Sequence, residues 1–153
     1  MTKDRCSLGR RTAFKIREQV ERGRRIDRAL ESCIQGVQSR ERAFAHELSY
    51  GVTRLRGRLD HLLSPHVHRG VDTLDPSVRE VLRLATYQLL YMHSVPDYAA
   101  VSESVAQVRS LVGKGAAGLV NAVLRKLATG GADTAEFPDL DSCLLYTSPS
   151  PRD

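Results

Sequence analysis

Apolar residues are densest between Asp75 and Met92, where the chain reads DPSVREVLRLATYQLLYM. Asp75 followed by Pro76 is typical of a helix start, because the carboxylate can cap the first turn and proline fits the first helical position. At about 100° per residue, the apolar side chains cover most of the circumference. They leave a narrow polar stripe of Arg79, Arg83 and Thr86. We therefore predict that this helix is buried on several sides, at the centre of a bundle.

Five other stretches have apolar residues three and four positions apart, as amphipathic helices do. They are a helix from the cap Ser7 to Arg22, one from Ile26 to Ile34, a long segment from Ser39 to Pro65, one from Tyr98 to Val112, and a last one over residues 119–127. No stretch alternates convincingly at period two, as a half-buried strand would. The sequence predicts an all-α fold, a bundle of six or seven helices with short connections.

The long segment contains two glycines and a cluster of arginines that affect its interpretation. Gly51 and Gly57 each cost about 1 kcal/mol relative to alanine in a helix, so we expect close packing or a bend there. The alternating Arg54, Arg56 and Arg58 cannot share one helical face. They either surround the helix or lie where it breaks.

Charge is distributed unevenly along the 153 residues, although the overall composition is that of an ordinary globular domain. Residues 1–58 carry 15 Lys/Arg and 7 Asp/Glu, a net charge of +8, whereas residues 59–153 carry 8 and 11, a net of −3. This asymmetry favours an anionic partner for the N-terminal half, most simply nucleic acid. The alternative is a solvated basic face that has no partner.

The sequence also indicates where the protein acts. No apolar run approaches the roughly 20 residues of a membrane span, and the charged start MTKDRCSLGRR is unlike a signal peptide. The three scattered cysteines, Cys6, Cys33 and Cys143, form no C-x-x-C pair. We therefore expect a cytoplasmic protein without a membrane partner.

No set of residues predicts catalysis, a cofactor site or a metal site. Residues 113–118 match G-x-G-x-x-G, but a helical pattern precedes them, so we interpret them as an interhelical loop in which glycine permits close approach. Five scattered histidines lack acidic or cysteine ligands at metal-binding spacing. Glu103 and Asn121, each inside an apolar helix, are either structural ties or RNA contacts, and we favour the first.

The composition changes at the end of the last helix. Residues 129–141 form a polar stretch rich in Gly and Asp, which we interpret as the start of an interdomain linker. Residues 142–153 end in CLLYTSPSPRD, which resembles a translated sequencing adapter rather than native protein. The alternative is a natural tail rich in serine and proline.

Two motifs carry a family resemblance. Residues 95–105, VPDYAAVSESV, and residues 118–125, GLVNAVLR, resemble the signature of the NusB-like domain family over roughly residues 7–128. The stretches FAHELSYGV (44–52), LRGRLD (55–60) and YQLLY (87–91) are most similar to the N-terminal domain of RsmB-type 16S rRNA (cytosine-C5) methyltransferases. The other branch of the family is the NusB antitermination factor, which binds RNA together with a small ribosomal protein.

The resemblance implies that residues 1–128 form a NusB-like RNA-binding helical domain, here truncated from a methyltransferase. The parent enzyme would use S-adenosylmethionine and a cysteine nucleophile in a missing domain, so this fragment itself would have no catalytic residue or cofactor. Its partner would be rRNA, with a small ribosomal protein added if it is of the NusB type. The alternatives are a stand-alone antitermination factor and, from another class, a helical protein-interaction scaffold.

The candidate RNA-binding residues are basic residues of the N-terminal half: Lys3, Arg5, Arg10, Arg11 and Lys15, with Arg54, Arg56 and Arg58. Aromatic residues make up 5% of the chain. We therefore expect contacts to phosphate and to RNA shape to outweigh base stacking.

Overall fold

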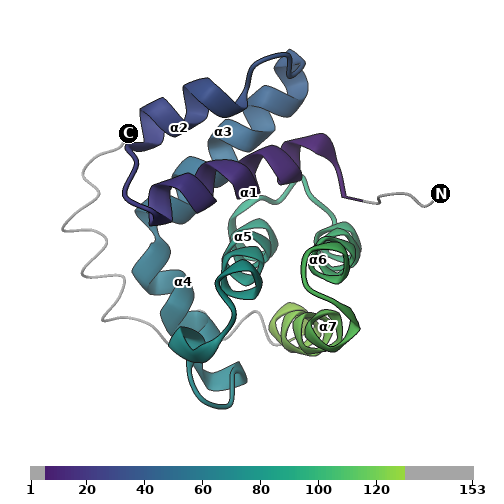
Figure 1. Ribbon diagram of the computed structural model, residues 1–153. Helices are drawn as coiled ribbons and strands as arrows, with labels where there is room; N and C mark the ends of the chain where they lie inside the picture. Colours follow the sequence, from purple (N-terminus) through teal and green to yellow (C-terminus); the bar gives the residue numbers. More distant parts are fainter. Residues whose placement is uncertain (1–5, 130–153) are drawn as a thin grey trace.

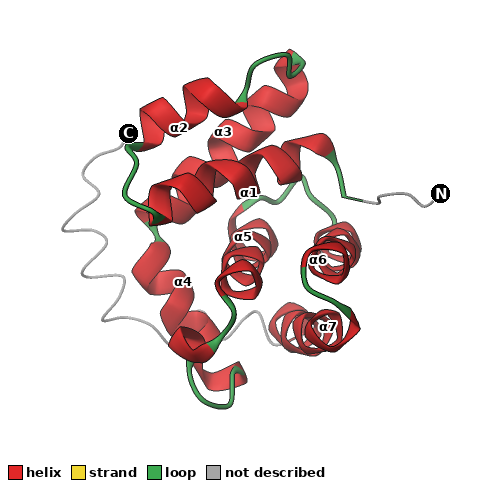
Figure 2. Cartoon of the chain, in the orientation of Figure 1, coloured by secondary structure: helices red, strands yellow, loops and turns green. Residues whose placement is uncertain are grey.

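The computed structural model describes residues 6–129, and over that range it contains helices and no strand (Figure 2). The α-helices are α1 (Leu8–Glu21), α2 (Ile26–Cys33), α3 (Ser39–Arg54), α4 (Arg56–Leu63), α5 (Pro76–Tyr91), α6 (Asp97–Leu111) and α7 (Lys114–Thr129). Two short 3-10 helices, η1 (Ser64–His66) and η2 (Val71–Thr73), lie between α4 and α5. The predicted all-α bundle is confirmed, with seven α-helices in the described part of the chain.

Helix α5 is the centre of the bundle, as its apolar circumference predicts. The Asp75 side chain accepts a hydrogen bond from the Ser77 backbone N–H at 2.8 Å, and Pro76 occupies the first helical position. In Figure 1, α5 lies among α1, α3, α4, α6 and α7, and it packs against each of them. Even its polar stripe is covered, because Arg83 and Thr86 are buried and Arg79 is half-buried.

Helices α1 and α3 lie side by side and run in the same direction. Near their starts, the Gly9 backbone N–H donates to the Glu41 side chain, and near their ends Arg17 donates to Thr53. Helix α2 connects them and packs on α1. On the other side of α5, helices α6 and α7 form a packed pair that Figure 1 shows nearly end-on.

The long third segment breaks at Leu55, which ends α3 and precedes α4. Of the two arrangements open for Arg54, Arg56 and Arg58, the break is the one observed. Gly51 packs closely, as predicted, because the Tyr87 ring fills the space that a Cβ atom would need. Gly57 has no atom within 4 Å of such a position and lies in the first turn of α4, next to the break.

The interpretation of residues 113–118 as a loop is wrong in part. Gly113, with φ +148°, joins α6 to α7, but Gly115 and Gly118 lie inside α7. Neither allows close approach, since no atom lies within 4 Å of where its Cβ would be. Helix α7 forms despite its glycines because its buried residues Ala117, Val120, Val123, Leu124 and Leu127 pack into the core.

Helix α7 ends at Thr129, one residue beyond the predicted domain boundary. The linker prediction beyond that helix and the adapter interpretation of residues 142–153 lie outside the described residues. In the part of the chain that the structure describes, no helix is long and apolar enough to cross a membrane.

Candidate nucleic-acid interface

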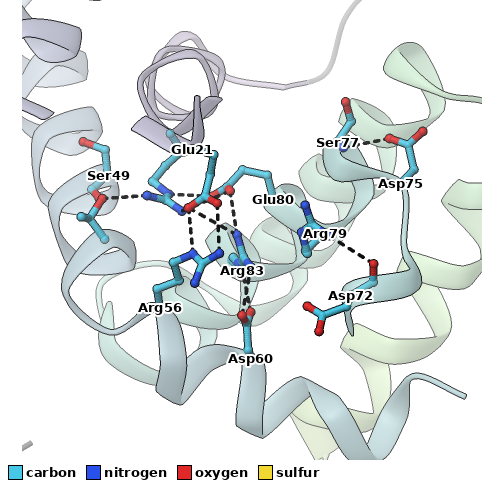
Figure 3. A network of polar contacts seen from close by, with 12 residues as sticks. Glu21, Ser49, Arg56, Asp60, Asp72, Asp75, Ser77, Arg79, Glu80 and Arg83 are labelled. Atoms are coloured by element: carbon cyan, nitrogen blue, oxygen red, sulfur yellow. Dashed lines mark hydrogen bonds and ion pairs between the residues drawn. The ribbon is translucent and has the colours of Figure 1, made fainter. Parts of the chain in front are cut away.

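Several arginines lie inside the bundle rather than on its surface. Arg17 is fully buried, and its Nε donates to Glu80 of α5 at 2.7 Å. Arg83, 1% exposed, donates to the two carboxylate oxygens of Asp60 at 2.7 and 2.9 Å and to Glu80 at 3.2 Å. Figure 3 shows this network, in which Glu80, Arg83 and Asp60 lie between α5 and α4. We call Arg17, Glu21, Asp60, Glu80 and Arg83 the buried charge network.

Glu21 joins this network to the junction of α3 and α4. Its carboxylate accepts hydrogen bonds from Arg17 and, at 2.8 and 3.1 Å, from Arg56. Partial burial by itself would raise the pKa of Glu21. The hydrogen bonds and positive charges of Arg56 and Arg17 outweigh that effect and lower the pKa from its ordinary 4.5 to about 2. The carboxylate is therefore charged at neutral pH and compensates Arg56.

Arg10, one of the predicted RNA-binding residues, also faces inward. Its Nε donates to Gln88 of α5 at 2.7 Å, and an NH group donates to Glu103 of α6 at 2.9 Å. Glu103 in turn accepts from the Ser7 backbone N–H at 2.8 Å, so it is a structural tie, as favoured above. Arg10 is buried and its charge is paired, so it is not part of a basic surface that RNA could contact.

The solvent side of α1 carries a basic stripe. Arg11, Lys15 and the C-cap residue Arg22 are four and seven positions apart, so they lie on one side of the helix, and all three are exposed. Glu18 lies among them and is 3.8 Å from Arg22. The Arg11 Nε donates to the Cys6 carbonyl at 3.2 Å. We call Arg11, Lys15 and Arg22 the α1 stripe.

The other predicted RNA-binding residues are divided among different environments. Arg54 and Arg56 are exposed near the α3–α4 junction, although Arg56 is paired with Glu21, and Arg58 is half-buried. Lys3 and Arg5 lie outside the described residues. The structure thus places Arg11 and Lys15 together on α1, and Arg54 and Arg56 together at the junction.

Several exposed cations within residues 1–58 were overlooked in the sequence analysis. They are Arg22, Arg24, Arg25, Arg28, Arg40 and Arg42. The charge of +8 over residues 1–58 contained the signal, but the arginines could not be sorted into exposed and buried groups without the fold. Asn121, the other uncertain polar residue, accepts a hydrogen bond from Arg125 on its own helix at 3.1 Å.

A hollow of about 350 Å³ lies between α1 and α5. Its polar lining mixes Glu18, Glu21 and Glu80 with Arg22 and Arg79, beside Phe14 and the start of α5. Such mixed charge favours neither an anionic nor a cationic ligand. In the described range, no three His, Cys, Asp or Glu residues are grouped so that they could hold a metal ion.

Known proteins similar to this chain include rRNA methyltransferases. Ribosomal RNA small subunit methyltransferase B of Thermus thermophilus is 38% identical over 126 residues, which cover 81% of this chain and 31% of the enzyme. Its counterpart in Escherichia coli is 30% identical over 147 residues, 95% of this chain and 34% of the enzyme. A putative methyltransferase of Mycobacterium tuberculosis is 43% identical over 93 residues, 61% of this chain and 20% of that protein. The chain thus spans between a fifth and about a third of the length of these relatives.

Antitermination proteins are similar as well. Transcription antitermination protein NusB of Shewanella pealeana is 33% identical over 85 residues, 56% of this chain and 63% of that protein. The crystallised NusB of T. maritima has the same fold, with a TM-score of 0.73 at 23% identity, over 84% of this chain and 92% of that one. NusB in a complex with NusE and dsRNA gives a TM-score of 0.74 at 20% identity, over 80% and 95%.

The sequence profile of the NusB family matches residues 8–129, which is the whole helical bundle from α1 to α7. The motifs noted in residues 95–105 and 118–125 fall in α6, the turn before it, and α7. The chain belongs to the NusB family.

Proposed function

We propose that this chain is an RNA-binding NusB-family domain that corresponds to the N-terminal part of an rRNA cytosine-C5 methyltransferase. The observation that carries the proposal is the similarity to ribosomal RNA small subunit methyltransferase B, which extends along 81% and 95% of the chain in two relatives. Those relatives act on ribosomal RNA, as their name says. The domain would hold rRNA, and it takes no part in methyl transfer itself.

The distribution of charge supports this proposal. The basic residues that face the core are neutralised by Glu80, Glu103 and Asp60, so they add little to the external field. The α1 stripe, in contrast, presents three cations and one nearby acid to solvent. No acidic residue occurs in the first turn of α1, although a negative charge there would interact favourably with the helix dipole. Such a surface suits the phosphate backbone of RNA.

Salt dependence of RNA binding tests the proposal. With about five phosphate contacts, log affinity for single-stranded RNA should fall against log salt with a slope near −3.5. Replacing the α1 stripe with glutamine, as Arg11→Gln, Lys15→Gln and Arg22→Gln together, should weaken binding and make that slope less steep by about 2.

A matched control removes three exposed cations from helices α6 and α7: Arg109→Gln, Lys114→Gln and Lys126→Gln. This variant changes the net charge equally but should retain most of the affinity and the slope. A flat salt titration of the unaltered chain would contradict RNA binding. Equal losses in the two variants would show that net charge acts, rather than the α1 stripe.

We infer that the parent protein would carry the cysteine nucleophile and S-adenosylmethionine in a further domain. The support is that this chain spans about a third of the length of its methyltransferase B relatives. Long-read sequencing of the source gene across the codon for Asp141 tests this inference. A reading frame that continues into such a domain would support it, and a stop codon soon after the last helix would overturn it.

A stand-alone antitermination factor is the second candidate, favoured by the similarity to NusB of Shewanella pealeana and by the fold shared with NusB in its NusE complex. It predicts tight binding of a small ribosomal protein of the NusE kind, measurable by calorimetry, whereas the methyltransferase assignment does not require it. A protein-interaction scaffold predicts weak RNA binding throughout. In that case, Arg11→Glu with Lys15→Glu should leave binding of its protein partner intact.

A further inference from the structure

A pair of stacked rings lies on the solvent side of α3. His46 and Tyr50, one helical turn apart, have ring centroids separated by 4.2 Å and ring planes inclined by 11°. His46 is exposed and Tyr50 is half-buried. Parallel rings at the surface of a helix are not needed to fill the core, which is already formed on the opposite side of α3 by Ala45, Leu48 and Val52.

Arginines extend this pair in both directions. Arg42 lies one turn before His46, Arg54 lies one turn after Tyr50, and both are exposed. Because residues four apart on a helix are neighbours, Arg42, His46, Tyr50 and Arg54 form a row, which we call the α3 row. Arg40 adds a further exposed cation on this helix, and Glu47 is an exposed acid beside the row. Cations therefore outnumber acids on the solvent side of α3.

Neighbouring elements support the row from behind. The Tyr87 ring of α5 packs against Gly51, which lies three residues before Arg54. Tyr91 lies 5.3 Å from Tyr87, centroid to centroid. On the α2 side, burial and then the Asp27 carboxylate raise the pKa of Tyr50 above its ordinary value of 10. Its ring is therefore neutral at physiological pH and adds no charge that would repel phosphate.

We propose that the α3 row binds unpaired RNA, with bases stacked on His46 and Tyr50 and phosphates contacted by Arg42 and Arg54. Flat aromatic faces flanked by cations match the alternation of base and phosphate along a single strand. Paired bases are already stacked inside a duplex and cannot reach such rings. The inference rests on the proposed RNA-binding function and adds a second surface that selects single strands. The α3 row also gives base stacking a larger share of the RNA contacts than we expected from the low aromatic content.

Two double variants of the full chain test the α3 row. His46→Gln with Tyr50→Leu removes both rings, whereas His46→Tyr with Tyr50→Phe keeps two rings at the same positions. The probes are a single-stranded RNA of about 12 nucleotides and the corresponding duplex, with binding followed by fluorescence anisotropy. Tyr98→Leu, which removes an exposed ring from α6, is the control, and melting curves confirm that each variant is folded.

The ring-free variant should bind the single strand at least roughly fivefold to a hundredfold more weakly, which is the loss expected for each stacked base. It should keep its affinity for the duplex and its salt slope, and the ring-retaining variant and Tyr98→Leu should bind like the unaltered chain. If the unaltered chain binds RNA with a steep salt slope but the ring-free variant binds equally well, the α3 row is refuted while RNA binding stands. If the unaltered chain binds no RNA, the proposed function fails first. An equal loss of single-strand and duplex binding would also overturn the proposal.

Discussion

The buried charge network makes a strong prediction about stability. Glu80, 4% exposed, lies between the buried guanidinium groups of Arg17 and Arg83. The substitution Glu80→Gln keeps the shape of the side chain but removes its charge. Two buried cations then depend on Glu21 and Asp60 alone, and both of these carboxylates are about a quarter exposed.

The size of the effect follows from the cost of an uncompensated buried charge. Breaking a buried ion pair by removing one partner costs about 3–5 kcal/mol. Because Glu21 still contacts Arg17 and Asp60 still binds Arg83 through two hydrogen bonds, we expect the lower end, about 3 kcal/mol. Against a typical total of about 5–15 kcal/mol, this loss should lower Tm by roughly 10 °C.

Urea denaturation followed by far-UV circular dichroism measures the free energy of unfolding of the variant and the unaltered chain. Glu31→Gln on α2 is a suitable control, since its side chain is exposed and lies outside the network, and it should change stability by no more than about 0.5 kcal/mol. Replacing both charged residues with apolar ones, Arg17→Met with Glu80→Leu, should destabilise the chain less than Glu80→Gln does. The double change removes the buried charge of Arg17 together with that of its partner. If Glu80→Gln unfolds at the same urea concentration as the control, the network does not stabilise the fold in the way argued here.

Three further predictions concern a glycine pair, a carboxylate and a helix cap. Gly51→Ala should destabilise the chain by about 1–3 kcal/mol because its Cβ overlaps the Tyr87 ring, while Gly118→Ala, in open space on α7, should stabilise it by about 0.5–1 kcal/mol. Thermal melts compare the two, and a loss at Gly118 would contradict the reasoning. Since the folded pKa of Glu21 is lowered to about 2 from 4.5, its stabilisation is fully present above pH 4.5 and is lost as the pH falls towards 2. The unfolding free energies of the unaltered chain and Glu21→Gln should therefore converge over that range, and a constant difference would argue against the shift. Asp75→Ala should lower the free energy of unfolding in urea by about 1 kcal/mol, because it removes the side chain that accepts from the Ser77 N–H. Asp75→Asn should retain most of that stabilisation.

Local sequence determined the helices and the position of the central one. Asp75 and Pro76 define the start of α5 through capping and backbone geometry, which act within one turn. Apolar spacing of three and four gives the buried faces, because helical periodicity depends on neighbouring residues alone. The close packing at Gly51 was also predictable, although its partner, Tyr87, was not. The interpretation of residues 113–118 failed because the packing of α7 outweighed the poor helix propensity of Gly115 and Gly118.

Tertiary structure alone decided which basic residues reach solvent. Arg10 and Arg11 are adjacent, yet Arg10 pairs with Glu103, 93 residues further along the chain, and Arg11 is exposed. Likewise Arg17 finds Glu80 at a separation of 63 residues. A buried charge is tolerated only where an opposite charge reaches it through the fold, and that partner leaves no trace in the local pattern. The sequence by itself therefore determined that the N-terminal half is basic, and the contacts of α1 with α5 and with Glu103 of α6 determined which of its cations reach solvent.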